Sequence, residues 1–478
     1  MSFDLALSPA HQSLVERTHR FAEEVVRPAA PRHDREEKFP WEVLEQAAQQ
    51  GFYNPLFYRD LIGDPTGLSL PLFMEELFWG CAGIGLSVVM PALALSAMAQ
   101  AATPEQLLRW APRCFGEPGD LKLAALCISE PQGGSDLRGL RTTARRDGDE
   151  WVIDGHKIWI GNGGIADVHV VNATVDPEAG HRGQALFVVP GGTPGLHLVR
   201  KLEKLGCRAS HTAELRFERC RVPADHLLGG AARLERRLGE AKGERPGDDG
   251  RSGGDDGSGG DDGSATIGAF EQTRPMVAAQ ALGIARAALE LARDYAAERE
   301  AFGGPIINKQ GISFQLADVA ADLDAARLLP WRAAWMAGQR VPFHHAEGSM
   351  SKLKASEAAV RATELAVQVC GGRGYVRDLP AEKWYRDAKL YTIFEGTSEI
   401  QRLVIGRALA DAAGEGPLHH QLGGGGPGGA LGRGSKIRSR AGRALSRLAR
   451  RTPESLARVP MVVASPPRSQ PRSRRGRD

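Results

Sequence analysis

Hydrophobic residues recur at helical spacing in the first part of the chain. Between residues 8 and 50 the apolar positions return every three to four residues, as on one face of an amphipathic helix. Ser8 followed by Pro9 is a typical helix start, with a capping side chain and a proline in the first turn. Pro28 and Pro31 predict the end of this first helix, because proline lacks the backbone donor that a helix interior requires.

The pattern changes near Leu121. Residues 68–102 are almost all apolar or small, which is typical of helices buried in a core. After Leu121 the chain shows short β-rich runs separated by Gly, Asp and Pro. We therefore predict an N-terminal helical domain over residues 1–122 and a small antiparallel β domain over residues 123–228.

Helical spacing resumes at about residue 269 and continues with few breaks to residue 413. Long amphipathic segments that follow one another closely predict a helical bundle, which we place at residues 267–413. The predicted fold class is mainly α, with a central β domain between two helical parts.

Two segments have a composition that does not favour a packed core. Residues 229–266 contain a run of glycine, serine and paired aspartates, and we predict a disordered insert there. A calcium-binding repeat is the alternative, but the glutamate and apolar anchors of an ion-binding loop are missing. Residues 414–478 are rich in Gly, Pro, Ser and Arg and predict a disordered basic tail. Contact of this tail with nucleic acid or acidic lipid is the alternative that we do not favour.

Composition excludes several classes of protein. The 478 residues are 42% hydrophobic and 25% charged, with a net charge of +3 that indicates no particular partner. Six scattered cysteines, without a Cys-x-x-Cys pair or clustered histidines, argue against a metal site or a disulfide framework. This cysteine usage and an N-terminus unlike a signal peptide lead us to expect a cytoplasmic protein. We find no apolar run of about 18 residues and expect no membrane span.

One carboxylate stands out near the end of the bundle. Glu395 follows a run of Tyr, Ile and Phe and precedes Gly396, Thr397 and Ser398, which predict a turn and a helix start. An apolar setting raises the pKa of a carboxyl group, and a general base works best when its pKa lies near the working pH. The stretch alone fits either a catalytic base or an ordinary loop glutamate.

Four glycine-containing loops accompany this carboxylate. They are ISEPQGGSD (128–136), WIGNGG (159–164), EREAFG (298–303) and QVCGGRGY (368–375). Glycine allows a ligand to approach the backbone closely. Loops of this kind in several domains suggest one large ligand held at a domain junction.

Together with RDAK (386–389) and FEGTSEIQ (394–401), these motifs resemble the acyl-CoA dehydrogenase family, in the family's own order. The resemblance runs from about Phe3 to about Ala413. It implies an N-terminal helical domain, a small β domain and a C-terminal four-helix bundle, with FAD held non-covalently between the last two. It also implies an acyl-CoA substrate, an electron-transferring flavoprotein as acceptor, and a homodimer or homotetramer.

The resemblance assigns residues to the cofactor by position. The positions implied to bind FAD are Ile128, Ser129, Ser135, Trp159, Gly161, Arg299, Phe302, Gln310, Gln368, Gly372, Thr397 and Glu399. The first five match the loops around the flavin ring and pyrophosphate, and the next five match the adenine and diphosphate end, some of them reaching across a dimer interface.

The resemblance also assigns the chemistry. Glu395 falls on the catalytic base of the short- and medium-chain type, which removes an α-proton while hydride passes to flavin N5 and yields a trans-2-enoyl-CoA. Some relatives place the base on an earlier helix, where this chain has Thr273, which cannot serve. The positions implied to contact the substrate are Ser135, Glu271, Arg274 and Gly396.

Three features depart from the family pattern. Gly161 replaces a Thr or Ser, and Ala301 replaces a hydroxyl residue, at a cost of about 0.5–1.5 kcal/mol for one lost hydrogen bond. The acidic insert lies near the expected CoA entrance, where its carboxylates would repel the CoA phosphates. Residues 86–95 are apolar and by resemblance floor the acyl pocket, without indicating the chain length.

The sequence therefore favours an FAD-dependent acyl-CoA dehydrogenase. Two alternatives stay open at this point. One is a catalytically silent scaffold that binds acyl-CoA, and the other is a flavin enzyme of the same fold that acts on a substrate without CoA. Glu395 favours the active enzyme over the scaffold, and Arg274 and Glu271 argue mildly for a CoA ester.

Overall fold

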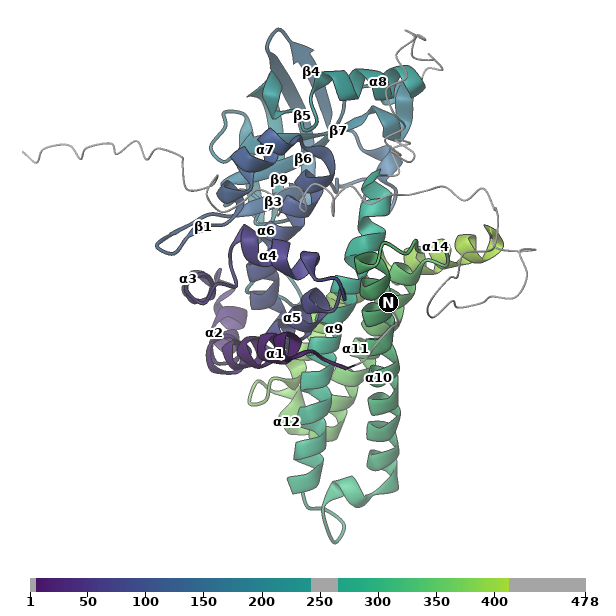
Figure 1. Cartoon of the computed structure of the whole chain (residues 1–478). Helices are drawn as coiled ribbons and strands as arrows, with labels where there is room; N and C mark the ends of the chain where they lie inside the picture. Colours follow the sequence, from purple (N-terminus) through teal and green to yellow (C-terminus); the bar gives the residue numbers. More distant parts are fainter. Residues whose placement is uncertain (1–5, 242–264, 412–478) are drawn as a thin grey trace, which may run out of the picture.

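The structure is a computed structural model that describes residues 6–241 and 265–411. The side chains of Arg138 and of residues 265–272 are outside this description. The aspartate-rich run, its calcium-binding alternative and the basic tail also lie outside the described residues. Figure 1 shows a sheet at the top, a group of N-terminal helices below it on the left, and a long helical bundle beside these helices that extends further down.

Residues 9–110 form helices joined by short connections, as the spacing of apolar residues predicts. The helices are α1 (Pro9–Phe21), α2 (Arg27–Glu36), α3 (Trp41–Gln49), α4 (Pro55–Gly63), α5 (Ser69–Gly80), α6 (Ala82–Ala101) and α7 (Pro104–Trp110). Ser8 caps α1 as predicted, with its hydroxyl accepting from the backbone N–H of His11 at 3.2 Å.

The predicted end of the first helix is wrong. A π-helical turn, Ala22–Val26, joins α1 to α2, and the helical course continues to Glu36. Pro28 lies in the first turn of α2, where a missing backbone donor costs little, and Pro31 lies inside α2. The wider hydrogen-bond ring of the π turn therefore carries the chain past both prolines.

Helix α6 lies in the centre of the molecule, beneath the sheet (Figure 1). Its 20 residues are long and apolar enough to cross a membrane, so the expectation that no apolar run reaches that length is wrong. In the structure, however, 72% of the tested window is buried inside the protein. The apolar character of α6 is thus used in the core, where it packs against the sheet and the bundle.

The middle part contains one seven-stranded sheet and a separate two-stranded ribbon. The strands are β1 (Gly116–Glu117), β2 (Asp120–Leu121), β3 (Ala124–Cys127), β4 (Thr143–Asp147), β5 (Glu150–Gly161), β6 (Val168–Thr174), β7 (Gln184–Pro190), β8 (Leu196–Lys201) and β9 (Thr212–Pro223). The large sheet runs β3-β6-β4-β5-β9-β8, with β7 also paired to β6.

The sheet is mixed rather than wholly antiparallel. Strands β5, β7, β8 and β9 pair as predicted, but β6 is parallel to β3 and to β4. All seven residues of β6 are buried, including the polar His169, Asn172 and Thr174, which fits a strand that is covered on both faces.

Part of the predicted disordered insert is helical. Helix α8 (Ala231–Ala241) lies inside residues 229–266, and the first residues of α9 overlap the end of that range. Leu234 is buried, and Leu238 packs against the core. Leu234 and Leu238 are four residues apart and lie on one face of the helix, before the glycine run begins. This amphipathic spacing explains why residues 231–241 are helical although we predicted disorder there.

The C-terminal part is the predicted bundle. Its helices are α9 (Ala265–Glu298), α10 (Gln310–Gly338), α11 (Glu347–Cys370), α12 (Gly372–Tyr375), α13 (Ala381–Lys389) and α14 (Ser398–Asp411). Helix α9 packs on α10, α11 and α5. Alanine fills much of this contact, which lets the helix axes approach closely.

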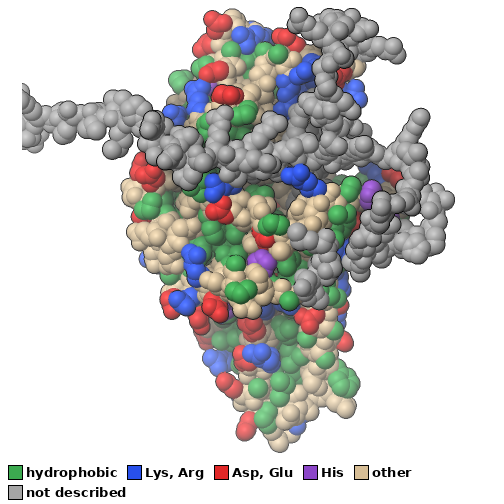
Figure 2. Space-filling view, in the orientation of Figure 1, with side chains coloured by type: hydrophobic (Ala, Val, Ile, Leu, Met, Phe, Trp, Pro, Cys, Tyr) green, Lys and Arg blue, Asp and Glu red, His purple; other side chains and the backbone are tan. Residues whose placement is uncertain are grey.

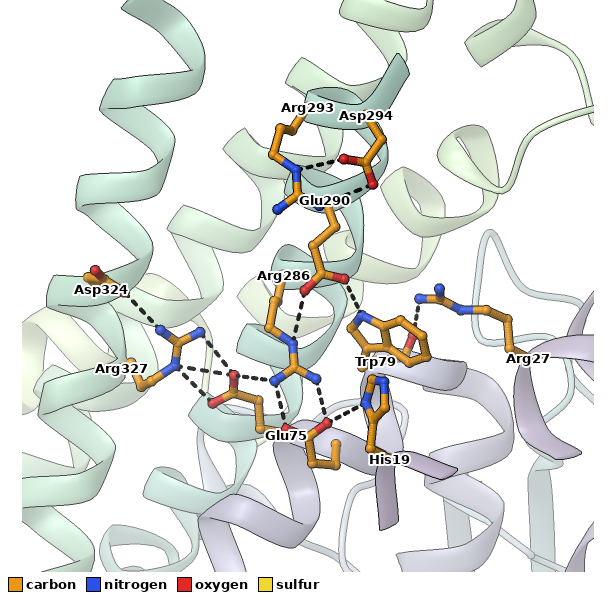
Figure 3. Close-up of polar contacts among 11 residues, drawn as sticks. His19, Arg27, Glu75, Trp79, Arg286, Glu290, Arg293, Asp294, Asp324 and Arg327 are labelled. Carbon is orange, nitrogen blue, oxygen red and sulfur yellow. Dashed lines mark hydrogen bonds and ion pairs between the residues drawn. The ribbon is translucent and has the colours of Figure 1, made fainter. Parts of the chain in front are cut away.

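A network of charged groups joins the N-terminal helices to the bundle (Figure 3). Arg286 of α9 binds both carboxylate oxygens of Glu76 of α5, at 2.6 and 2.5 Å. Arg327 of α10 binds Glu75 at 3.0 Å, and Trp79 donates to Glu290 at 2.6 Å. Glu75 is 4% exposed and Glu76 is 5% exposed. The network therefore fixes α5 against α9 and α10 through paired charges that are removed from water.

The RDAK motif forms a second junction, just before the loop that carries Glu395. Arg386 binds Asp34 of α2 at 2.7 Å, and its other contacts reach Glu382. Asp387 accepts the backbone N–H of Cys207, in the loop before β9, at 2.5 Å. Helix α13 is therefore tied to both other parts of the protein, which sets the start of the following loop.

Candidate active site

Glu395 lies in a strained turn between α13 and α14. Its φ angle is +54°, and that of Gly396 is +89°, so both residues are in the left-handed region. This conformation costs a non-glycine residue about 1–3 kcal/mol, and such residues are concentrated at functional sites. Tyr391 anchors the turn: its ring is buried and packs edge-on against Phe394, with 5.1 Å between ring centroids.

The start of α9 meets this turn. The hydroxyl of Thr273 donates to Oε2 of Glu395 at 3.3 Å, so the residue at the rival base position contacts the predicted base. Arg274 is 5% exposed and donates from Nη1 to the Ser349 hydroxyl at 2.7 Å. A Cβ atom placed on Gly396 would lie 3.8 Å from Nη2 of Arg274, so the guanidinium faces the same turn.

The electrostatic setting favours a poised carboxyl group. Burial raises the pKa of Glu395 above its ordinary value, while the Thr273 hydroxyl, Arg274 and Lys352 act in the opposite direction. The residue as a whole keeps intermediate exposure, which leaves an approach for a substrate. A carboxyl group with a raised pKa is a stronger base toward a carbon acid than an exposed one.

The two glycine loops of the middle part lie side by side. Trp159 is 57% exposed, has a φ angle of +60°, and lies in an irregular section of β5. A Cβ on Gly134 would be 3.8 Å from the Trp159 ring, so the loop after β3 passes along the indole. Ile128 and Ser129 are joined to β5 through their carbonyl oxygens, which accept from Lys157 Nζ at 2.8 Å and from the Ile158 N–H at 3.0 Å.

An exposed indole beside small residues offers a flat apolar surface for a planar ring system. The isoalloxazine of FAD is such a system, and the residues of the two loops therefore fit the flavin end of this cofactor. Ser135 is exposed in the same loop, where its hydroxyl is accessible to a ligand.

Gly161, at the end of β5, has a structural reason to be glycine. A Cβ at this position would lie 2.8 Å from both Sδ and Cε of Met90. The Met90 side chain, from α6, thus fills the space that a Thr or Ser side chain would use. Gly161 departs from the family pattern, and the space of the missing side chain is taken by Met90. Met90 belongs to residues 86–95, the segment predicted to floor the acyl pocket.

The residues matched to the adenine end lie elsewhere. Arg299 and Phe302 are in the connection from α9 to α10, and Gln310 is the first residue of α10. Gln368 is near the end of α11 and Gly372 begins α12, and all five residues are exposed. Arg274 and Glu298 are 24 residues apart on α9, which is about 36 Å at 1.5 Å per residue. The adenine-end residues therefore lie toward the end of the bundle opposite to the Glu395 turn, which meets the start of α9 (Figure 1).

The other predicted residues are close to Glu395 in sequence or at the start of α9. Thr397 caps α14, with its hydroxyl accepting from the Ile400 N–H at 3.3 Å, and Glu399 is exposed in the first turn. Glu271 lies in α9, but its side chain is outside the described part. Among the described residues, no group of three or more His, Cys, Asp or Glu side chains is placed to hold a metal ion.

Sequence reasoning missed three buried residues that support these loops. Lys352 and Gln401 both contact the Glu395 turn, and Lys157 holds the loop after β3. Each is fully buried. A charged residue within a run of small residues, as in Gly-Ser-Met-Ser-Lys before residue 353, was the signal available for Lys352.

The chain belongs to the acyl-CoA dehydrogenase family. It matches the family's N-terminal domain over residues 8–118, its middle domain over 125–220 and its C-terminal domain over 261–410. The resemblance inferred from the motifs and the predicted fold class are both confirmed. The protein is an FAD-dependent oxidoreductase that dehydrogenates acyl-CoA thioesters, with a place in fatty acid metabolism.

Particular relatives indicate a branch of the family. The short-chain specific acyl-CoA dehydrogenase, mitochondrial, of Bos taurus is 41% identical over 402 residues, which cover 84% of this chain and 90% of the relative. The structure of butyryl-CoA dehydrogenase from Megasphaera elsdenii is 32% identical with a TM-score of 0.73, covering 85% of this chain and 100% of the other. A structure described as the electron transferring flavoprotein of Acidaminococcus fermentans matches with 32% identity and a TM-score of 0.73, covering 85% and 99%.

Proposed function

We propose that this enzyme acts on short acyl-CoA thioesters and that Glu395 is its catalytic base. The observation that carries the second part is the left-handed turn that presents a carboxyl group with a raised pKa next to Thr273 and Arg274. The first part is supported by the short-chain and butyryl-CoA relatives and by Met90, which occupies space between α6 and Gly161.

In this mechanism the chain binds, orients and deprotonates the substrate. Glu395 removes the α-proton, and the nearby backbone, by the family resemblance, donates to the thioester oxygen as negative charge develops there. Bound FAD supplies the acceptor for the β-hydride. Arg274 and Gly396 lie at the same turn, which fits their predicted contact with the substrate. Ser135 and Glu271 are the other two residues that we assign to the substrate.

The FAD site we propose uses all the predicted cofactor residues. Ile128, Ser129, Ser135, Trp159 and Gly161 hold the flavin end, and Thr397 and Glu399 lie at the start of α14 beside Glu395. The remaining five residues, at the far end of the bundle, hold the adenine end of a cofactor. The Glu395 turn meets the start of α9 and Arg299 follows its end, about 36 Å further along the helix, so we assign these five residues to a cofactor bound mainly to another copy.

A homodimer or homotetramer follows from that division of the site. Exposed aromatic residues support it: Phe302, one of the adenine-end residues, is 94% exposed, and Tyr375, three residues after Gly372, is 82% exposed. Figure 2 shows further hydrophobic side chains on the surface of the lower part, where the bundle lies. Apolar side chains of this size at a surface favour burial against a partner.

We also propose an electron-transferring flavoprotein as the acceptor and the cytoplasm as the location. The acceptor is supported by the related structure described as an electron transferring flavoprotein. The location is supported by six free, buried cysteines, which suit a reducing compartment. Reduction of the purified acceptor by substrate-reduced enzyme, and cell fractionation, test these two proposals.

The decisive experiment for the reaction is anaerobic reduction of the bound flavin by butyryl-CoA. The wild-type holoenzyme is expected to bleach, and Glu395→Gln is expected to bind FAD and butyryl-CoA without bleaching, because the amide is nearly isosteric but not basic. Normal bleaching of Glu395→Gln would exclude Glu395 as the base. A chain-length series, with the fastest reduction for short acyl groups, tests the substrate class.

A further inference from the structure

Two buried side chains hold the turn that carries Glu395. Lys352 of α11 donates from Nζ to the carbonyl oxygen of Gly396 at 2.7 Å. Gln401 of α14 donates from Nε2 to the same oxygen at 2.8 Å and to the carbonyl oxygen of Glu395 at 3.1 Å. The two peptide carbonyls that follow the Glu395 α-carbon are therefore fixed, and that of Gly396 is held from two different helices.

The turn requires such support because of its conformation. Glu395 has a φ angle of +54°, which a non-glycine residue rarely adopts without constraint from its surroundings. Lys352 and Gln401 are both 0% exposed, so water does not compete for the two donors. A Cβ on Gly396 would lie 2.7 Å from Nε2 of Gln401, which shows how closely the amide packs on the turn.

The two donors differ in charge, and the charge is costly. A buried ammonium group loses its hydration, and burial accordingly lowers the pKa of Lys352 to about 8. Gln401 satisfies the same carbonyl oxygen without a charge. Hydrogen bonding alone therefore does not explain a lysine at position 352.

The carboxyl group of Glu395 explains the charge. Among the groups that act on Lys352, Glu395 is the strongest that favours the ammonium form, followed by Glu399 of α14 and Glu357 of α11, while Arg274 of α9 opposes it. The effect is reciprocal, because Lys352 and Arg274 both favour the ionised form of Glu395. The ammonium group thus offsets the burial that disfavours the carboxylate.

We propose that Lys352 is a positioning residue for the dehydrogenation, which clamps the Gly396 carbonyl and keeps Glu395 in its basic form, and that Gln401 is the uncharged half of the same clamp. This inference rests on the proposed role of Glu395. Lys352 of α11 would thus assist proton abstraction by holding the turn that carries Glu395, without touching the substrate.

The test is a pH profile of flavin reduction by saturating butyryl-CoA, measured anaerobically by stopped flow on FAD-loaded holoenzymes. The variants are Lys352→Met, Lys352→Gln and Gln401→Leu, with Lys354→Met as the control. Lys354 is on the same helix but is partly exposed and pairs with Asp322 at 2.9 Å, away from the turn. Lys352→Gln keeps a donor of similar reach without the charge, and it decides the result if Lys352→Met does not retain FAD.

Loss of the Lys352 charge is expected to move the acid limb of the profile upward by about one pH unit, the low end of what a nearby opposite charge produces. The reduction rate on that limb then falls about tenfold at a fixed pH. Gln401→Leu is expected to lower the rate without moving the limb, and Lys354→Met is expected to change neither.

Thermal melting separates this role from a merely structural one. Lys352→Met removes a hydrogen bond from the strained turn and is expected to melt below wild type, whereas Lys352→Gln keeps a donor and is expected to melt near wild type while it still reduces its flavin more slowly. An unmoved acid limb in both Lys352 variants would overturn the proposal. Failure of the wild type itself to be bleached by butyryl-CoA would instead refute the proposed function.

Discussion

The contact between Gly161 and Met90 leads to a prediction about packing at the active site. Gly161→Thr restores the side chain that the family pattern has at this position. Its Cβ would meet Sδ and Cε of Met90 at 2.8 Å, a separation shorter than normal van der Waals contact. The Met90 side chain is flexible and partly exposed, so it can move, but it must leave its present rotamer.

The magnitude follows from these distances. Overpacking of this kind costs about 1–3 kcal/mol. Met90→Ala removes the clashing atoms and, from a partly buried site, is expected to cost about 1–2 kcal/mol by itself. In the double variant the threonine occupies part of the vacated space, so the two costs should not add, and a coupling of about 1 kcal/mol or more is expected.

Thermal melting of the four holoenzymes measures this cycle. For a chain of this length, 1 kcal/mol corresponds to about 1–2 °C, so Gly161→Thr is expected to melt a few degrees below wild type and the double variant to recover part of that loss. Gly63→Thr is the control, because a Cβ at Gly63 meets no atom within 4 Å. The chain-length profile is a second measurement, in which Met90→Ala is expected to accept longer acyl groups. If the destabilisation of the double variant equals the sum of the two single variants, Met90 does not pack against position 161. If Met90→Ala also leaves the chain-length profile unchanged, Met90 does not limit the length of the acyl pocket.

Three further predictions concern the junction, the flavin loop and the base. Arg286→Met leaves the buried Glu76 without its main partner and is expected to destabilise the protein by about 3 kcal/mol in thermal melting. Arg293→Met, in an exposed pair, should cost less than about 0.5 kcal/mol, and equal effects would contradict the junction. Burial opposes ionisation of Glu130, but Lys157 and two backbone N–H groups hold its pKa at about 2. Because this pKa is lower than the ordinary 4.5, the stabilisation is complete above about pH 4.5 and is lost as the pH falls through about 2. Glu130→Gln should remove about 3 kcal/mol at pH 7 and flatten the acid unfolding curve, and an unchanged curve would exclude the pair. For Glu395 the raised pKa predicts that flavin reduction falls as the medium is acidified, with a midpoint above that of an ordinary glutamate, and a midpoint at or below the ordinary value would count against the buried setting.

Much of the fold was predictable because it depends on local patterns. The spacing of apolar residues placed the helices before Leu121 and after residue 269, and the change to β-rich runs placed the sheet. One failure arose from a local feature and the other from contacts between distant segments. Pro28 and Pro31 were misread because a π turn precedes them, whereas residues 231–241 were misread because Leu234 is buried in the core.

The site divides in the same way. The motifs predicted Glu395 as the base and Trp159 and the glycine loops as flavin contacts, since these residue types have the properties that the reaction requires. Lys352 and Gln401 could not be inferred, because a buried lysine or glutamine has no sequence signature until the helix that carries it is packed against its target. Their contacts span 44 and 5 residues, from two different helices.

The sequence alone determined the class of enzyme, the order of its three parts and the residue in the position of the base, because helix spacing, turn residues and motif order are local properties of the chain. The tertiary structure decided three further matters: which residues hold the Glu395 turn, why Gly161 has no side chain, and that the adenine-end residues lie about 36 Å along α9 from Arg274. Each of these depends on how distant segments pack together. Packing weighs the burial of apolar groups against the cost of removing charges from water and against steric fit, and a short stretch of sequence does not reveal that outcome.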